Sequence, residues 1–304
     1  MRVKKLSVVA LGGNALMRPG ERGTAAEQRA NLAATFQAIG PLLAEVPFVI
    51  THGNGPQVGN ELLRHELASA EAPPLPLYVA VAQTQAEIGS LVAAELEPAA
   101  GRPVVVVMTR VEVDPNDPAF QNPTKPVGPF YDAAHAEALE RERGWAVEED
   151  AGRGWRRVVP SPKPLSVLEL ESVRTLLESG VAVVAAGGGG VPVVSKNGRH
   201  DGIDAVIDKD HASALLAIGL GAERLVILTQ VPGVYEEFGS EEQRLITELR
   251  LGTDDAIAER LAAGSMRPKV EAALRFVAET GGEALITSAE AIENGEAGTR
   301  VVPP

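Results

Sequence analysis

Three lysines stand at positions where a positive charge could take part in chemistry. Lys125 lies in the proline-flanked run PTKP, Lys209 lies between two aspartates, and Lys269 follows the run GSMRP. Phosphoryl transfer depends mainly on positioning and on positive charge around the phosphoryl oxygens, and lysines from separate parts of a chain can supply that charge. A lone lysine is more often a solvated surface charge, so the hypothesis of a site rests on the combination of the three.

Asp210 comes directly after Lys209, at the start of a predicted helix. Two interpretations stay open for this residue. Its carboxylate is suited to capping the helix, and it is equally suited to orienting lysines or a magnesium ion. Histidine offers no alternative metal site, because the five histidines show no spacing typical of metal ligands.

Three glycine clusters each follow a predicted strand, at residues 12–14, 53–55 and 187–190. The carboxyl ends of parallel strands meet at one edge of a sheet, and ligands bind in the crevice there. Glycine lets backbone N–H groups approach an anion closely, and the helix that follows adds its positive N-terminal end. One such cluster would only indicate a tight turn, but three at one edge favour an anion-binding site.

Other common catalytic designs are missing from the chain. It contains no G-x-x-x-x-G-K-[ST] motif, and the run GNGPQVG at 53–59 has a misplaced last glycine and a proline where a dinucleotide-binding helix should begin. It has no G-x-S-x-G motif and no cysteine, so no covalent nucleophile is visible. An acceptor that is already ionised needs no general base, and phosphoryl transfer to a small acid fits these absences.

Composition restricts the class of protein further. The 304 residues are 45% hydrophobic with few aromatics, and the formal net charge is -13. This charge argues against nucleic acid as a partner, because a phosphate backbone requires a basic surface. No stretch approaches the roughly 20 apolar residues of a membrane span. The apolar run within residues 1–11 is too short for a secretory signal and precedes no cleavage site, so we expect a first strand and a cytoplasmic protein.

The elements that must position these residues alternate along the chain. Six short runs rich in Val and Ile predict buried strands at 6–11, 46–51, 104–109, 181–186, 225–229 and 283–287. Segments with helical spacing lie at 24–43, 57–70, 166–179 and 209–218. This alternation predicts an α/β protein with a mainly parallel sheet and helices on both faces.

Residues 111–165 interrupt the alternation. Their prolines are too frequent for a central strand or a helix interior, yet they hold five of the eleven aromatic residues. We interpret the segment as an inserted lid subdomain with a small core, within a single domain over residues 1–304. A loop without function is the alternative.

Seven stretches, taken in order, resemble carbamate kinase, a family within the amino acid kinase superfamily. They are LGGNAL at 11–16, THGNGPQVGNEL at 51–62, DPNDPAFQNPTKPVGPFY at 114–131, EDAGRGWRRVVPSPKP at 149–164, AAGGGGVPV at 185–193, DAVIDKDHAS at 204–213 and GSMRPKVEAA at 264–273. The HGNGPQ and PTKPVGPFY forms separate this family from acetylglutamate, aspartate and uridylate kinases. The resemblance covers nearly the whole chain.

The resemblance implies a three-layer α/β/α sandwich with a protruding lid, paired as a homodimer. It also implies that the protein uses ATP and Mg²⁺ to phosphorylate carbamate, giving carbamoyl phosphate and ADP. In arginine breakdown the family runs toward ATP. The residues implied in phosphoryl and acid binding are Gly12, Gly13, Asn14, Gly53, Asn54 and Gly55. Those implied in charge neutralisation are Lys209 and Lys269, organised by Asp210, with Lys125 closing from the lid. The nucleotide would be bordered by Gly187, Gly188, Thr229, Val231, Tyr235 and Met266.

The chain also departs from the family pattern. Ala214 and Leu215 stand where the family commonly has a further lysine, and Gln230 and Pro232 replace its usual acidic and glycine residues. These differences bear on nucleotide affinity. Two other hypotheses stay open: a kinase of another small acid on the same fold, and a regulatory protein that binds ATP without turnover.

Overall fold

The computed structural model describes residues 6–44, 47–149, 154–261, 266–296 and 298–304. Within these ranges, the main sheet has eight strands in the order β15-β17-β16-β12-β1-β2-β9-β3. Their bounds are β15 Glu248–Arg250, β17 Thr299–Val302, β16 Glu283–Thr287, β12 Arg224–Leu228, β1 Ser7–Leu11, β2 Phe48–His52, β9 Ala182–Val184 and β3 Val104–Val106. Neighbouring strands are parallel except β16 and β17. Each of the six predicted runs overlaps a strand of this sheet, and residue 46 of one run lies outside the described residues.

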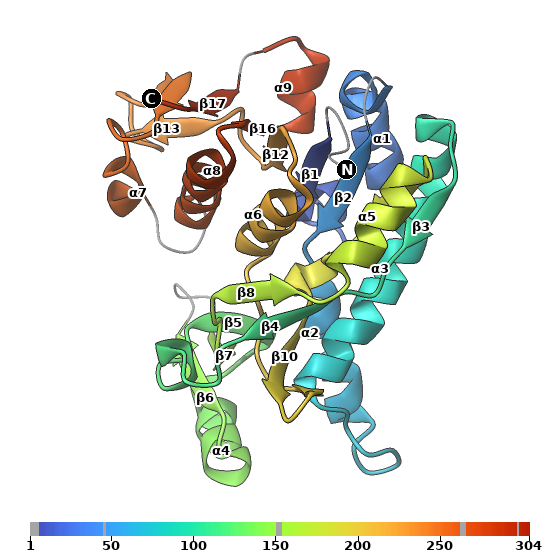
Figure 1. The fold of residues 1–304 in the computed structure, drawn as a ribbon. Coiled ribbons are helices and arrows are strands. Elements are labelled where there is room, and N and C mark those ends of the chain that lie inside the picture. The colour runs from blue at the N-terminus through green and yellow to red at the C-terminus, as the bar shows by residue number, and fades with distance from the viewer. Residues whose placement is uncertain (1–5, 45–46, 150–153, 262–265, 297) are drawn as a thin grey trace.

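Helices cover both faces of the sheet, as the alternating pattern predicted (Figure 1). One layer contains α1 (Ala25–Ala44), α3 (Leu77–Ala100) and α9 (Ala289–Glu293), and the other contains α5 (Leu170–Glu178), α6 (Lys209–Leu220) and α8 (Arg267–Thr280). Side chains of a strand alternate between faces. Accordingly, Val8 packs in the core under α6 and α8, while Val9 packs in the core under α1 and α3.

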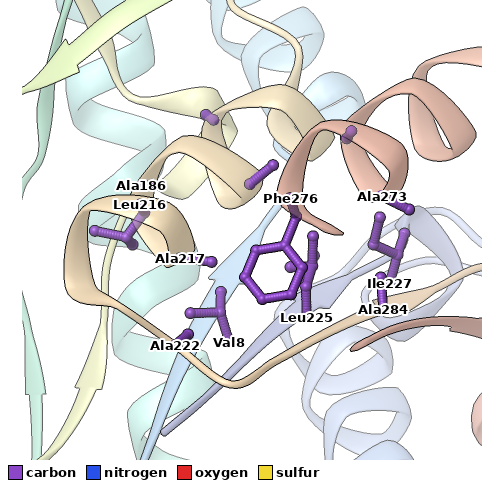
Figure 2. Close-up of a cluster of buried hydrophobic side chains, with 14 of the residues drawn as sticks. Val8, Ala186, Leu216, Ala217, Ala222, Leu225, Ile227, Ala273, Phe276 and Ala284 are labelled. Carbon is purple, nitrogen blue, oxygen red and sulfur yellow. The ribbon is translucent and has the colours of Figure 1, made fainter. Parts of the chain in front are cut away.

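Figure 2 shows the core between the sheet and the layer of α6 and α8. The ring of Phe276, from α8, lies among Leu225 and Ala217 with small alanines around it. All three side chains are fully or almost fully buried. Burying a side chain of this kind contributes roughly 1.5–3 kcal/mol, so this layer is firmly attached to the strands that carry the glycine loops.

Two sequence-based expectations about helices differ from the structure. The predicted helix at 166–179 begins only at Leu170, because β8 (Pro164–Val167) pairs with β4 (Arg110–Val113) instead. The long helix α3 was not predicted at all. Its apolar residues are buried against both α1 and β3, so they show no clean one-sided pattern.

Smaller sheets extend from the main body. One has the order β11-β10-β4-β8, with β11 at Arg199–Gly202 and β10 at Val191–Lys196. Another has the order β5-β7-β6, with β5 Lys125–Tyr131, β7 Trp155–Val159 and β6 Ala146–Glu149, and it carries α4 (Ala133–Arg143). A hairpin of β13 (Val234–Glu236) and β14 (Arg244–Ile246) stands before the short helix α7 (Ile257–Arg260).

Segment 111–165 starts within β4 and ends within β8, and between them it forms the sheet of β5, β6 and β7 (Figure 1). This part has a core of its own around Tyr131, Ala136 and Leu139, with Trp145 and Trp155 packed against it. Three of the five aromatics thus share a small core, whereas Phe120 packs against the main core and Phe130 is exposed. Helix α2 (Gly55–Leu67) packs against β5 and joins this unit to the glycine loop before it.

Among the described helices, none is both long and apolar enough to cross a membrane.

Candidate active site

The site lies where the direction of strand addition reverses. The chain adds β2 on one side of β1 and later returns to place β12 on the other side. In open α/β sheets, ligands bind outside the carboxyl ends of the strands at such a switch point. A cavity of about 370 Å³ opens there, lined by Gly12 and Gly13 after β1, by Thr229 after β12, and by Lys209 and Lys269.

Asp210 holds two of the predicted lysines together. Its Oδ1 accepts a bond from Lys209 Nζ at 2.6 Å and its Oδ2 accepts one from Lys269 Nζ at 2.9 Å. The carboxylate is 2% exposed, and the lysines come from the first turns of α6 and α8. Two ammonium groups from helices 60 residues apart are thereby fixed at the same edge of the cavity.

The helix cap is Asp208, two residues earlier, whose Oδ1 accepts a bond from Asp210 N at 2.9 Å. The capping interpretation of Asp210 was therefore wrong, and its carboxylate is free to orient lysines. Sequence reasoning missed Asp208, although an aspartate directly before the first predicted helical residue is typical of a cap.

Burial and charge act against each other on these groups. Burial lowers the pKa of Lys209, and the Asp210 carboxylate only partly offsets this effect. For Asp210, burial alone would raise the pKa, but Lys209 and Lys269 outweigh burial and hold the pKa below its usual value. Asp210 is therefore ionised near neutral pH, and it keeps a compensating negative charge between the two lysines.

Lys125 reaches the same place from the start of β5. Its Nζ donates to Asp208 Oδ2 at 3.0 Å, and its side chain is 37% exposed. Burial would raise the pKa of Asp208, but Lys125, His211 and Lys209 together outweigh burial and keep that pKa low. The three lysines and two aspartates leave one net positive charge at the N-terminus of α6, whose dipole adds to it.

The glycine loops lie against these lysines. A Cβ on Gly53 would be 3.3 Å from Lys209 Cδ, and a Cβ on Gly12 would be 2.5 Å from the carbonyl oxygen of Leu228. A larger residue at Gly12 would therefore separate β1 from β12. Gly55 is exposed at the start of α2, where the first N–H groups have no partner within the helix.

Asn14 does not line the cavity that contains the lysines. Its Oδ1 accepts a bond from Gln230 Nε2 at 2.7 Å, and it lines a neighbouring cavity of about 480 Å³ beside α1 and α9. Gly12, Thr229 and Gln230 line both cavities. Asn14 and Gln230 thus form part of the wall between the two cavities, rather than part of the lysine cluster.

Asn54, Gly187 and Gly188 lie beneath the site. The Asn54 side chain is buried and donates to Thr84 Oγ1 at 2.9 Å. A Cβ on Gly188, which has φ +63°, would be 2.3 Å from Asn54 Nδ2, and one on Gly187 would be 2.5 Å from His52 Nε2. Neither glycine lines the cavity with the lysines. The third glycine cluster therefore packs a buried layer against the 52–54 loop, and the structure does not bring it to the expected nucleotide border.

The opposite end of the cavity is apolar. Val231, Tyr235 and Met266 line it, as three of the residues predicted to border a nucleotide, and so do Leu261 and Phe238. Phe238 was not predicted, and its isolated position in a polar run gave no periodic signal. One cavity therefore has a cationic end and an apolar, aromatic end, which matches the two halves of a nucleotide.

Magnesium has no dedicated cage among these residues. Asp208 and Asp210 are both paired with lysines, and in the described part of the chain no three acidic or histidine side chains gather as metal ligands. Mg²⁺ commonly keeps several waters and binds to substrate phosphates with one or two carboxylates at most. The residues present therefore fit a magnesium ion only if substrate phosphates supply most of its ligands.

A cationic pocket at the switch point, continuous with an apolar cavity, is typical of an ATP-dependent phosphotransferase. Known proteins agree with this class. A model of the amino acid kinase family matches residues 5–288. Carbamate kinase from Pyrococcus horikoshii is 45% identical over 310 residues, covering 97% of this chain and 98% of that protein. The Trichomonas vaginalis carbamate kinase is 43% identical, covering 97% and 99%.

The solved structures give the same answer. Carbamate kinase from Giardia lamblia bound to AMP-PNP superposes with a TM-score of 0.90 at 39% identity, covering 99% of each chain. The chain belongs to the amino acid kinase family and, within it, to the carbamate kinases.

Proposed function

We propose that this protein transfers a phosphoryl group reversibly between ATP and carbamate, giving ADP and carbamoyl phosphate. The observation that carries the proposal is the pairing of Lys209 and Lys269 by one buried carboxylate, beside the Gly12 loop at the sheet switch point. Fixed positive charge at this place is what a transferring phosphoryl group requires.

In the direction of carbamoyl phosphate synthesis, an ionised carbamate oxygen attacks the γ-phosphorus of ATP. The new P–O bond forms as the bond from phosphorus to the β–γ bridging oxygen breaks, and ADP leaves with that electron pair. No proton has to be removed from the acceptor, so the site needs no general base. His52 agrees with this, because its burial lowers its pKa to about 4 and its Nδ1 lies 2.9 Å from the Gly53 carbonyl oxygen.

Each lysine has a separate task in this proposal. Lys209 and Lys269 neutralise the charge that develops on the transferring group and on the bridging oxygen, and Asp210 keeps both ammonium groups in place before the substrate arrives. Lys125 contacts the small acid from the lid. The N–H groups around Gly12, Gly13, Gly53 and Gly55 bind phosphoryl oxygens, since glycine allows their close approach.

Two further parts of the proposal rest on the family alone. Magnesium would enter with the nucleotide and neutralise its phosphates, without a cage of protein carboxylates. A homodimer follows from the same resemblance. We also propose a cytoplasmic location, as expected from the sequence. Light scattering after gel filtration tests the dimer, and omission of Mg²⁺ from the assay tests the metal.

The reaction is tested by incubating the purified protein with ADP, Mg²⁺ and carbamoyl phosphate and measuring ATP by a coupled assay. Acetyl phosphate serves as the rival donor, and preferential use of acetyl phosphate would contradict carbamate as the acid. We expect Lys209→Met to reduce ATP formation by about 100- to 1000-fold, in line with the loss of a group that stabilises developing charge.

The matched control for that variant is Lys196→Met, an exposed lysine at the end of β10. It should retain full activity. Circular dichroism must show that Lys209→Met is folded, which we expect because Asp210 keeps its bond to Lys269. Full activity of folded Lys209→Met would overturn the assignment.

A further inference from the structure

The cavity carries an exposed aromatic ring, Phe238, that lies outside the seven stretches that resemble carbamate kinase. Phe238 lies on the segment between β13 and β14 and is 68% exposed, although it lines the same cavity as Lys209 and Lys269. We infer that Phe238 stacks on the nucleobase and sets the affinity for the nucleoside part of the nucleotide. This inference rests on the proposed function only in taking a nucleotide as the ligand.

The polarity of the cavity fixes which end receives the base. Gly12, Gly13 and the two lysines make one end cationic, so the phosphates belong there. The other end is lined by aliphatic and aromatic side chains, namely Val231, Tyr235, Phe238, Leu261 and Met266. A nucleobase is flat and weakly polar on its faces, and apolar lining with few polar groups is typical of small-molecule sites.

Phe238 and Tyr235 form a continuous aromatic wall at this end. Their ring centroids are 5.8 Å apart with planes tilted by 56°. Tyr235 is in β13 and partly buried, so it supports the wall from the sheet side, whereas Phe238 presents its ring at the mouth. Aromatic faces bind every base by stacking, so the ring contributes affinity without reading the edge of the base.

The turn that carries Phe238 is built to hold one shape. Glu237 has a φ of +49°, which is uncommon for a residue other than glycine. Its carbonyl oxygen accepts a bond from Ser240 Oγ at 2.8 Å, and Gly239 N donates to Gln243 Oε1 at 3.1 Å. Left-handed backbone of this kind persists where the surrounding bonds determine it, and it often marks a ligand clamp.

Other exposed apolar residues do not share this position. Among the described residues, the large apolar side chains with high exposure also include Leu67, Leu75, Met108, Phe130 and Leu165. None of these five lines the cavity that contains Lys209 and Lys269. Isolated exposed apolar residues are common and need no explanation. Phe238 differs from them because a nucleotide bound in the cavity would cover its ring.

The test compares two ligands by titration calorimetry, ADP and inorganic tripolyphosphate, on Phe238→Ala, Phe238→Trp and the unchanged protein. Phe238→Ala should weaken ADP binding by roughly 5- to 100-fold, the range found when a base loses an aromatic partner. Tripolyphosphate has no base, so its affinity should change by less than about twofold. Phe238→Trp should bind ADP at least as well as the unchanged protein, because a larger ring stacks more strongly.

Leu67→Ala is the matched control, since this side chain is 78% exposed at the end of α2 and lines none of the cavity. It should leave both affinities unchanged. Equal ADP affinity in Phe238→Ala and the unchanged protein would overturn the inference. An equal loss of ADP and tripolyphosphate affinity would also overturn it. A change of oligomeric state without a change in ADP affinity would overturn it as well, because Phe238 would then be a subunit contact.

The result of the Phe238 test can be distinguished from the result of the activity assay that tests the proposed function. If ADP binding depends on Phe238 but no ATP forms from carbamoyl phosphate, the proposed reaction fails and the inference stands. If ATP forms at a normal rate with an unaltered KM for ADP in Phe238→Ala, the reaction stands and the inference fails.

Discussion

Replacing Asp210 by asparagine removes the negative charge between two largely buried ammonium groups and should destabilise the fold. The side chains of Lys209 and Lys269 are only 13% and 14% exposed, and both donate to this carboxylate. Removing one partner of a buried ion pair costs about 3–5 kcal/mol, because the remaining charge has no compensation. In a chain of this length, such a loss lowers the melting temperature by roughly 5–8 °C.

The assay is urea unfolding at pH 7 and pH 9.5, followed by circular dichroism. Burial lowers the pKa of Lys209, and without Asp210 this pKa should fall further, so the lysine can shed its proton at pH 9.5. The destabilisation should therefore be smaller at pH 9.5 than at pH 7. Tripolyphosphate should stabilise Asp210→Asn more than the unchanged protein, since a phosphate can take the place of the lost carboxylate.

Two comparisons decide whether the reasoning is right. Asp201→Asn, an exposed aspartate in β11, should change stability by less than about 0.5 kcal/mol. The double variant Asp210→Asn with Lys269→Met should recover part of the loss, because it buries one charge fewer. A stability of Asp210→Asn within about 1 kcal/mol of the unchanged protein would refute the argument, and so would additive losses in the double variant.

Two further predictions concern His52 and Lys125. Burial lowers the pKa of His52 from 6.5 to about 4. Between these two pH values the unfolded chain therefore binds a proton that the folded chain does not. The free energy of unfolding should fall by up to about 3 kcal/mol as the pH is lowered from 6.5 to 4. Urea unfolding at pH 7 and 4.5 should show a smaller fall in His52→Gln, and an equal fall would contradict the prediction. Lys125→Met should raise the KM for carbamoyl phosphate by about 10-fold while changing the melting temperature by less than about 2 °C, because its partly exposed ion pair contributes at most about 1 kcal/mol. Steady-state kinetics with an unaltered KM would argue against contact with the acid.

Most of the strands of the main sheet could be predicted from the sequence, because each is encoded by a short local pattern of residues. Each buried strand is a short run of Val, Ile and Ala, and glycine loops at 12–13 and 53–55 directly follow two of them. The class of protein followed from complete motifs in the right order. Lys209 and Lys269 were recognisable because proline and acidic residues surround them.

The parts that could not be predicted depend on contacts between distant segments. Gly187 and Gly188 resemble an anion loop in sequence, but their missing side chains make room for His52 and Asn54. Strand β8 exists because β4 is available to pair with it, and nothing within 164–167 excludes a helical start. The pairing of Lys125 with Asp208 joins residues 83 apart, so no local pattern could contain it.

The pairing between Lys125 and Asp208 makes the charge of the site depend on the position of β5. With Lys125 in place, the cluster around the start of α6 carries one net positive charge. If β5 moves away by more than a few ångströms, Lys125 takes its charge with it, and the two remaining lysines are balanced by Asp208 and Asp210. Displacement of β5 would thus leave an electrically neutral cluster, and its return would restore the attraction for anions. A bound polyphosphate would then favour the position of β5 seen here, and added salt should weaken this coupling.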